Sequence, residues 1–397
     1  MMYSFVGKEQ YMKISGIVCE YNPFHNGHMY HIEETRKNGA THIAAVMSGN
    51  FVQRGDLAVA DKFRRAETAV NCGADLVIEL PVMYSLAPAE LFARGAVHLL
   101  NSLGVVDEIS FGSECGDVGE LISAADALAE IENSPKIREL TEQGRTYAKA
   151  VSAVLGELYP KAAEIISQPN NVLGVEYIKA IKYFSSHISP FTVKRAGAGH
   201  DSGEICGGYA SASYIRANIA DSAAFLPKNS AELIMGDRAD IHRLEGAILY
   251  RLRTAGLEEI KNTADCADGL AERIYSARGA TSLDEFFESV KTKRFTMARI
   301  RRIVLSLLIG ITKEDIKNLS PYGRIIALNG RGREILAEAK GKSLIPFDTS
   351  LAKLSRNDGI SGRFAELEAA ASDIYGLAFE NVIPTQREFT AKIILQE

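Results

Sequence analysis

Two histidines spaced three residues apart, His25 and His28, follow closely on an apolar run at residues 14–19. The residues after them have helical spacing, so the segment predicts a strand, a short turn and a helix that begins near Asn26. Backbone N–H groups in the first turn of a helix have no partner within the helix, and they attract anions. The pattern therefore predicts a phosphate site with two imidazoles beside it.

The residue types in this segment suit chemistry at phosphorus. Imidazole N–H groups can donate to oxygens that gain charge during substitution, and each well-placed donor is worth roughly 10²- to 10³-fold in rate. Gly27 lets a nucleotide approach the backbone, and Pro23 fixes the turn before His25. His31 is expected on the same helix face as His28. A zinc site is not expected, because no nearby cysteine or carboxylate completes a tetrahedral ligand set.

Composition limits the classes of protein that the chain can be. It has 397 residues, 46% of them hydrophobic and 24% charged, and a net charge of -5. These values predict a globular protein of two or three domains whose contact with a polyanion would use a local patch. No apolar run reaches the ~18 to 20 residues that a membrane span needs, and the N-terminus lacks an export signal. Five scattered cysteines without a Cys-x-x-Cys pair indicate reduced thiols. We therefore expect a cytoplasmic protein with no membrane partner.

Strand and helix patterns alternate along the first half of the chain. Strands are predicted at 13–19, 42–47, 75–80, 107–111 and 191–195, and helices at 27–38, 59–72 and 88–103. This alternation predicts an α/β fold with a doubly wound parallel sheet, whose ligands bind beyond the carboxyl ends of the strands. We divide the chain into an N-terminal extension without assigned role (1–12), a catalytic domain (13–225) with a helical insertion near 117–165, and a mostly helical C-terminal domain (226–397). A short strand–helix–strand pattern lies within that last part, at 325–347.

Loops at the predicted ligand edge hold further polar residues. The loop after the second strand is expected to bind a second substrate or to be an ordinary connection; its candidate residues are Ser48, Gly49, Asn50, Gln53 and Arg54. Gly112 follows the fourth strand, Asn170 and Asn171 could contact a base or cap a helix, and Arg195 ends the fifth strand. Ser213 and Arg216 lie at a further predicted helix start, where a hydroxyl and a cation suit phosphate.

A basic segment at 291–302 holds six cations and no acid. It predicts contact with a polyanion such as RNA, with a solvated helix end as the alternative. The residues assigned to this contact are Lys291, Lys293, Arg294, Arg299 and Arg302. Neither a Gly-x-x-x-x-Gly-Lys-Ser/Thr loop nor a Gly-x-Gly-x-x-Gly turn is present, which excludes a P-loop enzyme and disfavours a dinucleotide site.

The segment 16–31, Gly-Ile-Val-Cys-Glu-Tyr-Asn-Pro-Phe-His-Asn-Gly-His-Met-Tyr-His, resembles the nucleotidyltransferase superfamily with its His-x-Gly-His signature, and more narrowly the tRNA-Met cytidine acetate ligase family. Segments 47–55, 73–81, 111–114, 169–174 and 194–195 match that family in the same order. A departure is Ser-Ala-Ser-Tyr-Ile-Arg at 211–216, where the superfamily usually has Ser-Ser-Thr-x-Ile-Arg. The resemblance covers residues 13 to about 220 with specific motifs.

The resemblance implies an ATP-dependent ligase that forms acetyl-adenylate and then acetylates the wobble cytidine of elongator tRNA-Met. His25 and His28 would be catalytic, Mg²⁺ would assist, and acetate and the tRNA would be the partners, with no protein partner expected. Together with the helix start at 213–216, ATP contacts are predicted at Val18, Cys19, Glu20, Tyr21, Asn22, Pro23, Phe24, His25, Asn26, Gly27, His28, Met29, Tyr30, His31, Gly112, Asn170 or Asn171, Arg195, Ser213 and Arg216. An adenylyltransferase that makes a nucleotide cofactor and a non-catalytic RNA-binding protein are the alternatives.

Overall fold

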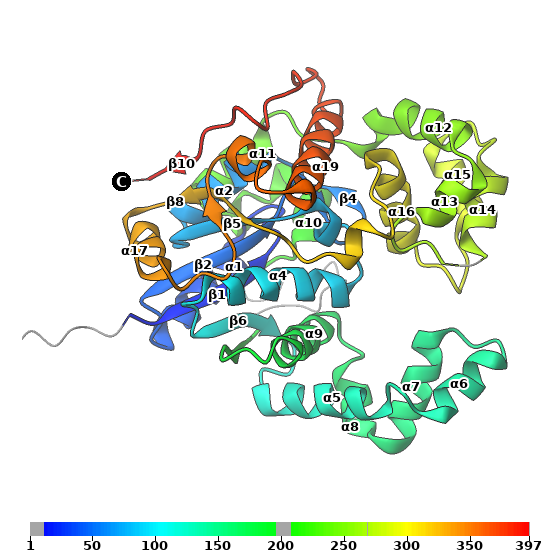
Figure 1. The fold of residues 1–397 in the computed structure, drawn as a ribbon, viewed down its shortest axis with the longest axis horizontal. Coiled ribbons are helices and arrows are strands. Elements are labelled where there is room, and N and C mark those ends of the chain that lie inside the picture. The colour runs from blue at the N-terminus through cyan, green and yellow to red at the C-terminus, as the bar shows by residue number, and fades with distance from the viewer. Residues whose placement is uncertain (1–11, 196–207, 268, 397) are drawn as a thin grey trace, which may run out of the picture.

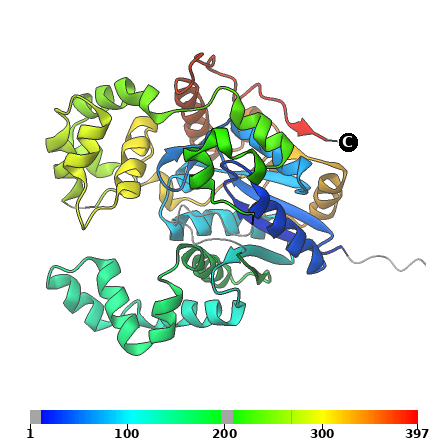
Figure 2. The ribbon, with the colours of Figure 1, turned by 180° about the vertical axis from the view of Figure 1, so that it is seen from behind.

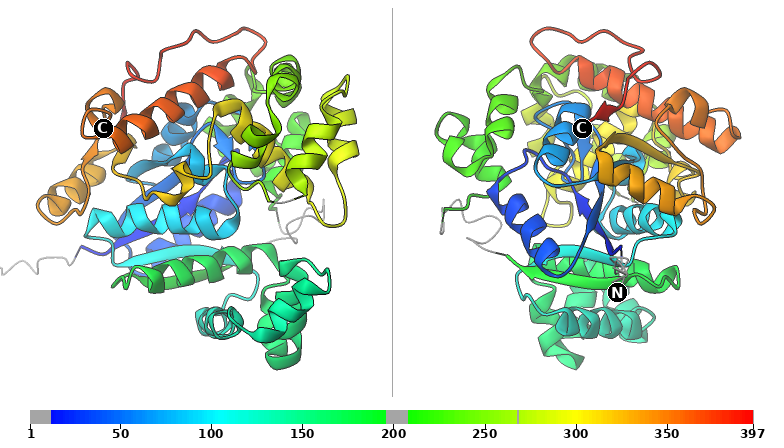
Figure 3. Two further views of the ribbon diagram at one scale, coloured as in Figure 1. Left: turned by 45° about the vertical axis from the view of Figure 1, so that its right-hand side comes forward. Right: turned by 90° about the vertical axis from the view of Figure 1, so that its left-hand side faces the viewer.

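The computed structural model describes residues 12–195, 208–267 and 269–396 and is built on one central sheet. Five strands of this sheet are mutually parallel, in the order β5 (Leu76–Leu80), β2 (His42–Ser48), β1 (Ile14–Cys19), β6 (Glu108–Ser113) and β7 (Ser189–Lys194). Helices cover both of its faces, so the predicted α/β fold with a doubly wound sheet is confirmed (Figures 1 and 3). Residues 1–11 of the predicted extension lie outside the described part.

The helices of the two faces pack on alternate residues of the strands. Ile43 and Met47 of β2 share a core with Ile32 of α1 (Asn26–Lys37) and with α2 (Lys62–Asn71), whereas Val46 packs with residues of α4 (Ala89–Leu103). Every residue of β2 is buried, as expected for a strand covered on both faces. Figure 1 shows α4 crossing the front of the sheet, and α1 lies on the opposite face, in dark blue in Figure 2.

Two helical lobes extend from the same side of the sheet (Figure 1). The first lies where the insertion is predicted and contains α5 (Val118–Ile131), α6 (Pro135–Glu142), α7 (Tyr147–Leu158) and α8 (Pro160–Ile165), after which α9 (Pro169–Tyr183) leads into β7. The second, called the basic lobe below, contains α12 (Glu245–Thr254), α13 (Leu257–Asn262), α14 (Leu270–Ala277), α15 (Leu283–Val290) and α16 (Met297–Ile309). The segment before it holds α10 (Ala212–Ala217) and α11 (Lys228–Met235).

The C-terminal part of the chain is mostly helical, as predicted, and its last segment returns to the sheet. β8 (Gly323–Leu328) pairs antiparallel with β5, and the short strands β9 (Phe347–Asp348) and β10 (Ile394–Leu395) pair with β8. The helices of this part are α17 (Gly330–Ala339), α18 (Leu351–Leu354) and α19 (Gly359–Gly376). The sequence pattern predicts this strand–helix–strand unit, but not its partner, because pairing of β8 with β5 joins segments more than 240 residues apart.

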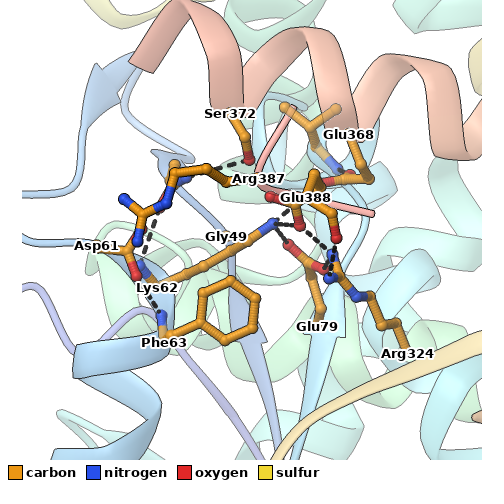
Figure 4. Close-up of polar contacts among 12 residues, drawn as sticks. Gly49, Asp61, Lys62, Phe63, Glu79, Arg324, Glu368, Ser372, Arg387 and Glu388 are labelled. Carbon is orange, nitrogen blue, oxygen red and sulfur yellow. Dashed lines mark hydrogen bonds and ion pairs between the residues drawn. The ribbon is translucent and has the colours of Figure 1, made fainter. Parts of the chain in front are cut away.

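A buried ion network fastens this returning segment to the sheet (Figure 4). Lys62 at the start of α2 pairs with Glu79 of β5 and with Glu388, and its Nζ lies 3.9 Å from Glu368 of α19. Arg324 of β8 pairs with the same Glu79 and Glu388. Burial raises the pKa of Glu368 well above its usual range, whereas Lys62 and Arg324 outweigh burial and hold the pKa of Glu388 below it. The paired charges of Lys62, Glu79, Arg324 and Glu388 thus join four segments of the chain, and Glu368 lies beside them as a fifth.

Candidate active site

A cavity of about 530 Å³ opens at the carboxyl ends of β1, β6 and β7. Its walls come from the loop after β1, the first turns of α1, α9 and α10, and the hairpin of β3 (Phe51–Val52) and β4 (Asp56–Leu57). The predicted site residues that line it are Val18, Cys19, Glu20, Tyr21, Asn22, His25, Gly27, His28, Tyr30, His31, Gln53, Arg54, Gly112, Asn170, Arg195, Ser213 and Arg216. The position matches the general rule for ligands of doubly wound sheets.

The paired histidines cap the helix that they begin. The Nδ1 atom of His25 accepts a hydrogen bond from the Gly27 N–H at 3.1 Å, and the Nδ1 atom of His28 accepts one from the His25 N–H at 3.2 Å. The two rings stack with their centroids 3.6 Å apart and their planes at 20°. A Cβ atom at position 27 would lie 3.0 Å from the His25 ring, so glycine allows this stacking. The capping bonds therefore fix both rings at the cavity wall.

These hydrogen bonds also fix which ring nitrogen carries the proton. A nitrogen that accepts from a backbone N–H carries no proton, so each neutral ring carries its proton on Nε2. Burial, with the neighbouring His25 ring and Arg195, holds the pKa of His28 well below its ordinary value. Both rings thus offer Nε2–H as the hydrogen-bond donor, and at neutral pH His28 carries no positive charge.

His31, one turn further along α1, is held by a chain of hydroxyl groups. The Thr35 hydroxyl donates to the His31 carbonyl at 2.8 Å, and it lies 2.7 Å from the Ser110 hydroxyl. Since the single Thr35 proton is used, Ser110 donates to Thr35 and accepts from Nε2 of His31 at 2.9 Å. Burial, with Arg195 nearby, lowers the pKa of His31 to about 4. His31 is therefore neutral at physiological pH.

The loop after β1 is held at several points along its backbone. The Glu20 carboxylate accepts from the Gln53 N–H at 2.7 Å, and Arg216 of α10 donates to the Asn22 carbonyl at 2.8 Å. The Asn22 side-chain oxygen accepts from the Val59 N–H at 2.8 Å. Withdrawal of the Glu20 carboxyl group from solvent raises its pKa, although Arg216, Arg65 and Arg54 act in the opposite direction. The structure thus places the Glu20 carboxylate of the loop after β1 near the Arg216 guanidinium of α10 at the cavity.

Asn170 and Asn171 have different surroundings at the start of α9. Asn171 is 2% exposed, and its side-chain oxygen accepts from the backbone N–H groups of Glu114 and Cys115 at 2.9 and 3.2 Å. Asn170 lines the cavity, and its side-chain oxygen accepts from Arg195 at 3.3 Å. The Glu114 carboxylate accepts from the backbone N–H groups of both asparagines. Asn170 is therefore the one that faces the cavity, and Asn171 is structural.

Some of the predicted substrate residues lie away from the cavity. The carbonyls of Ser48 and Gly49 accept from the Arg65 guanidinium, and the Asn50 side-chain oxygen accepts from the Lys62 N–H at 2.9 Å. All three are buried, because their polar groups close the loop onto α2. Ser48, Gly49 and Asn50 therefore lie outside the lining described, and their substrate role stays a prediction. Pro23, Phe24, Asn26 and Met29 of the predicted ATP segment are also absent from the lining described.

The basic segment before and within α16 is only partly exposed. Arg299 and Arg302 both pair with Asp265; burial of Arg302 argues against its predicted contact with RNA, whereas Arg299 is partly exposed. Lys291, Lys293 and Arg294 are exposed, and Lys291 lies 3.9 Å from Glu288. Asp265, which neutralises the two arginines, lies outside residues 291–302. A count of charges within that segment therefore could not reveal the pairing.

Several apolar lining residues were not predicted from the sequence. They include Ala89, Phe92, Phe111, Val172, Leu173 and Tyr177. Their apolar side chains are typical of core positions in helices and strands, and only the tertiary fold places them at the cavity. Among the described residues, no group of three or more histidines, cysteines or carboxylates is placed to hold a metal ion. No helix in the part of the chain described is long and apolar enough to cross a membrane.

Known proteins resemble this chain over almost all of its length. A family model described as HIGH Nucleotidyl Transferase matches residues 12–389. A tRNA(Met) cytidine acetate ligase of Acetivibrio thermocellus is 37% identical over 97% of this chain and 100% of its own length, and one of Caldanaerobacter subterraneus subsp. tengcongensis is 39% identical over 96% and 100%. The chain belongs to the tRNA(Met) cytidine acetate ligase family. The predicted resemblance is confirmed, and the protein is an enzyme of the ligase class.

Solved structures of this ligase family share the whole fold. The crystal structure of Thermotoga maritima TmcAL without ligand has a TM-score of 0.91 at 32% identity, covering 97% of this chain and 99% of that one. The structure of the same protein bound with alpha-thio ATP has a TM-score of 0.89 at 31% identity and the same coverage. A member of the tRNA(Met) cytidine acetate ligase family therefore binds an ATP analogue on this fold.

Proposed function

We propose that this protein is an ATP-dependent acetate ligase that forms acetyl-adenylate and transfers the acetyl group to the N4 amine of the wobble cytidine in elongator tRNA-Met. The observation that carries the proposal is the pair of His25 and His28, which cap α1 through Nδ1 and keep their protons on Nε2 at the cavity. Family membership and the ATP analogue bound by a relative support it.

In the first step, an acetate oxygen attacks the α-phosphorus of ATP and pyrophosphate leaves. The Nε2–H groups of His25 and His28 donate to phosphate oxygens that gain charge, each worth roughly 10²- to 10³-fold. Arg195 and Arg216, which both line the cavity, stabilise the triphosphate and the departing pyrophosphate. Acetate is already an anion at neutral pH, so this step moves no proton.

In the second step, the cytidine amine attacks the acetyl carbon and AMP leaves. The amine is a weak nucleophile because its lone pair is delocalised into the ring, so activation of the acid as a mixed anhydride makes the attack feasible. Holding the amine against the acyl carbon supplies much of the remaining acceleration. A single-stranded anticodon base can be turned out of its stack into such a cavity.

The exposed cations between α15 and α16 of the basic lobe are candidates for RNA contact. Lys291, Lys293 and Arg294 lie at the surface, and Arg294 packs over the Phe295 ring at 5.2 Å. We assign the tRNA contact to these three rather than to Arg299 and Arg302. A tRNA substrate places the proposed reaction in the cytoplasm. Mg²⁺ would be held mainly by the triphosphate oxygens and water, since the described lining residues include one carboxylate, Glu20.

The test uses purified protein, ATP, acetate and hydroxylamine, which traps acetyl-adenylate as acetohydroxamate. We expect product from the wild type and a loss of roughly 10²- to 10³-fold in His28→Asn. Asparagine can accept the capping N–H as Nδ1 does, but it lacks the Nε2 donor. His28→Gln is the matched control, because it has a donor near the Nε2 position and lacks the cap acceptor. Equal turnover in His28→Asn and the wild type would overturn the assignment.

The two alternative functions give different results in the same preparation. A cofactor adenylyltransferase would move AMP onto a phosphomonoester such as pantetheine phosphate or nicotinate mononucleotide and would ignore acetate. A non-catalytic RNA-binding protein would bind tRNA with a steep salt dependence and consume no ATP. Acetate-dependent pyrophosphate release that is followed by acetylation of tRNA-Met separates the proposed ligase from both.

A further inference from the structure

The two proposed steps differ in their need for a base. Acetate attacks ATP as an anion, so the adenylation step releases no proton. The cytidine amine begins with two hydrogens and ends with one, so the transfer step must release a proton. A group at the cavity that can accept a proton at neutral pH would therefore serve the second step and not the first.

The histidines of the cavity are unsuited to that task. His25 and His28 use Nδ1 to accept backbone N–H groups and carry protons on Nε2, so neither ring has an open nitrogen. His31 donates to Ser110 through Nε2, and with a pKa of about 4 it is a weak base at neutral pH. Burial raises the pKa values of Cys19 and Tyr177, which keeps both of them protonated.

Glu20 is the only carboxylate among the described residues that line the cavity. Its Oε1 atom accepts from the Gln53 N–H at 2.7 Å, which orients the carboxylate while leaving it further lone pairs. Glu20 lies at the carboxyl end of β1, five residues before the first phosphate-directed histidine. Glu20 therefore lines the same cavity as His25 and His28.

We propose that Glu20 is the general base that accepts the proton from the cytidine amine during acetyl transfer, a role that rests on the proposed function. The amine lone pair forms the N–C bond to the acetyl carbon, and the C–O bond to AMP breaks with its electron pair leaving on AMP. The N–H proton passes to the Glu20 carboxylate and then to solvent. No other reactant is needed for the balance.

Three arginines near Glu20 favour its ionised form, which a general base must recover after each turnover. Arg216 of α10, Arg65 of α2 and Arg54 of the β3–β4 hairpin face it, with Cys19 of β1 and Tyr177 of α9 as its titratable neighbours. Withdrawal from solvent raises the pKa of Glu20, which strengthens it as a base, while the Gln53 N–H and the three arginines limit that rise.

The experiment measures the two half-reactions separately in Glu20→Gln. Acetate-dependent exchange of pyrophosphate into ATP reports adenylation, and single-turnover acetylation of tRNA-Met by enzyme loaded with acetyl-adenylate reports transfer. We expect transfer to be slowed by roughly 10²- to 10⁴-fold and exchange to be slowed far less than transfer. The wild-type transfer rate should rise with pH through the Glu20 pKa, whereas Glu20→Gln should show no such step. Glu20→Asp, which keeps a carboxylate, should recover part of the rate.

Glu114→Gln provides the matched control. Both oxygens of Glu114 accept from backbone N–H groups at the start of α9, so a purely structural carboxylate stands at the same sheet edge. Its substitution should change both half-reactions in parallel through ATP binding. Transfer at the wild-type rate in Glu20→Gln, or an equal loss of both half-reactions, would overturn the role of Glu20. Absence of acetate-dependent exchange in the wild type would instead refute the proposed function and the role that rests on it.

Discussion

The Arg302 guanidinium of α16 donates a hydrogen bond to the Gln53 carbonyl at 3.3 Å, and the Gln53 N–H in turn donates to Glu20. Asp265 accepts from the same guanidinium at 2.8 Å. A Cβ atom at position 55 would lie 2.6 Å from the Arg302 backbone nitrogen, so a glycine with φ +72° lets the hairpin reach α16. The basic lobe thus buttresses the cavity wall that holds the proposed base.

Removal of Arg302 should therefore destabilise the protein. Its side chain is 9% exposed and that of Asp265 is 13% exposed, so Arg302→Leu would remove one of the two cations that pair with a largely buried carboxylate and leave Arg299 as the other, at a cost of about 2 kcal/mol. Arg301→Leu is the matched control, because Arg301 lies 3.6 Å from Asp56 with both side chains at least 33% exposed, and it should cost less than about 1 kcal/mol. Urea unfolding measures both values. Equal costs would contradict the bracing role of Arg302.

The two neighbouring asparagines of α9 should separate stability from ATP binding. Asn171→Ala would leave two buried N–H groups without their acceptor and the Ile165 carbonyl without its donor, lowering the free energy of unfolding by about 2–4 kcal/mol. Asn170→Ala should change stability by less than about 1 kcal/mol and raise the KM for ATP. Thermal unfolding and steady-state kinetics on both variants check this. A larger loss of stability in Asn170→Ala would reverse the assignment.

Acid should destabilise the protein through its buried histidines. The pKa of His31 is about 4 in the folded protein and near 6.5 in the unfolded chain, so between those values the unfolded chain binds more protons. Stability is therefore full above pH 6.5 and falls as the pH is lowered toward 4, by up to about 3 kcal/mol from this residue.

His31→Gln isolates that contribution, since its amide can still donate to the Ser110 hydroxyl but does not titrate in this range. The other buried groups are common to both proteins, so the difference between their stability profiles reports His31 alone. We expect the profile of His31→Gln to be flatter between pH 6.5 and 4 in urea melts. Parallel profiles would show that His31 is not a neutral buried group.

The buried ion network should respond unequally to one and the same substitution. Glu388→Gln removes a charge that pairs with Lys62 and Arg324, and it should cost about 3 kcal/mol or more. Glu368→Gln should cost less than about 1 kcal/mol, because burial already favours the protonated carboxyl, and glutamine can still accept from the Val82 N–H. Chemical unfolding of the two variants measures both costs. Similar costs would mean that Glu368 is ionised.

The parts of the site that local sequence determines were predictable. A buried strand, a proline turn and a glycine between two histidines are adjacent in the chain, and α1 begins at Asn26, as the spacing predicts. The hydrogen bonds by which Nδ1 of His25 and His28 cap α1 are also local. They depend on the orientation of the two rings, which the types of the residues do not specify. Asn170 and Asn171 could not be told apart, because both satisfy the same helix-start pattern.

The parts that depend on distant segments were not predictable. Arg299 and Arg302 count as free cations in the sequence, and only the fold brings Asp265 to them. The buried state of Ser48 and Gly49 likewise depends on Arg65, whose guanidinium folds back from α2 onto their carbonyls. In each case a charged side chain finds its partner through tertiary structure, which local periodicity does not encode.

The antiparallel pairing of β8 with β5 makes the nucleotide-binding half dependent on sequence that is translated much later. A fragment ending at residue 225 would expose β5 as a bare edge with unpaired N–H and C=O groups, and it would leave Lys62 and Glu79 without Arg324 and Glu388. Such edges recruit strands from other molecules. Excising the His-x-Gly-His half as an independent unit should therefore produce aggregates, and engineering of this enzyme has to carry residues 323–395 along.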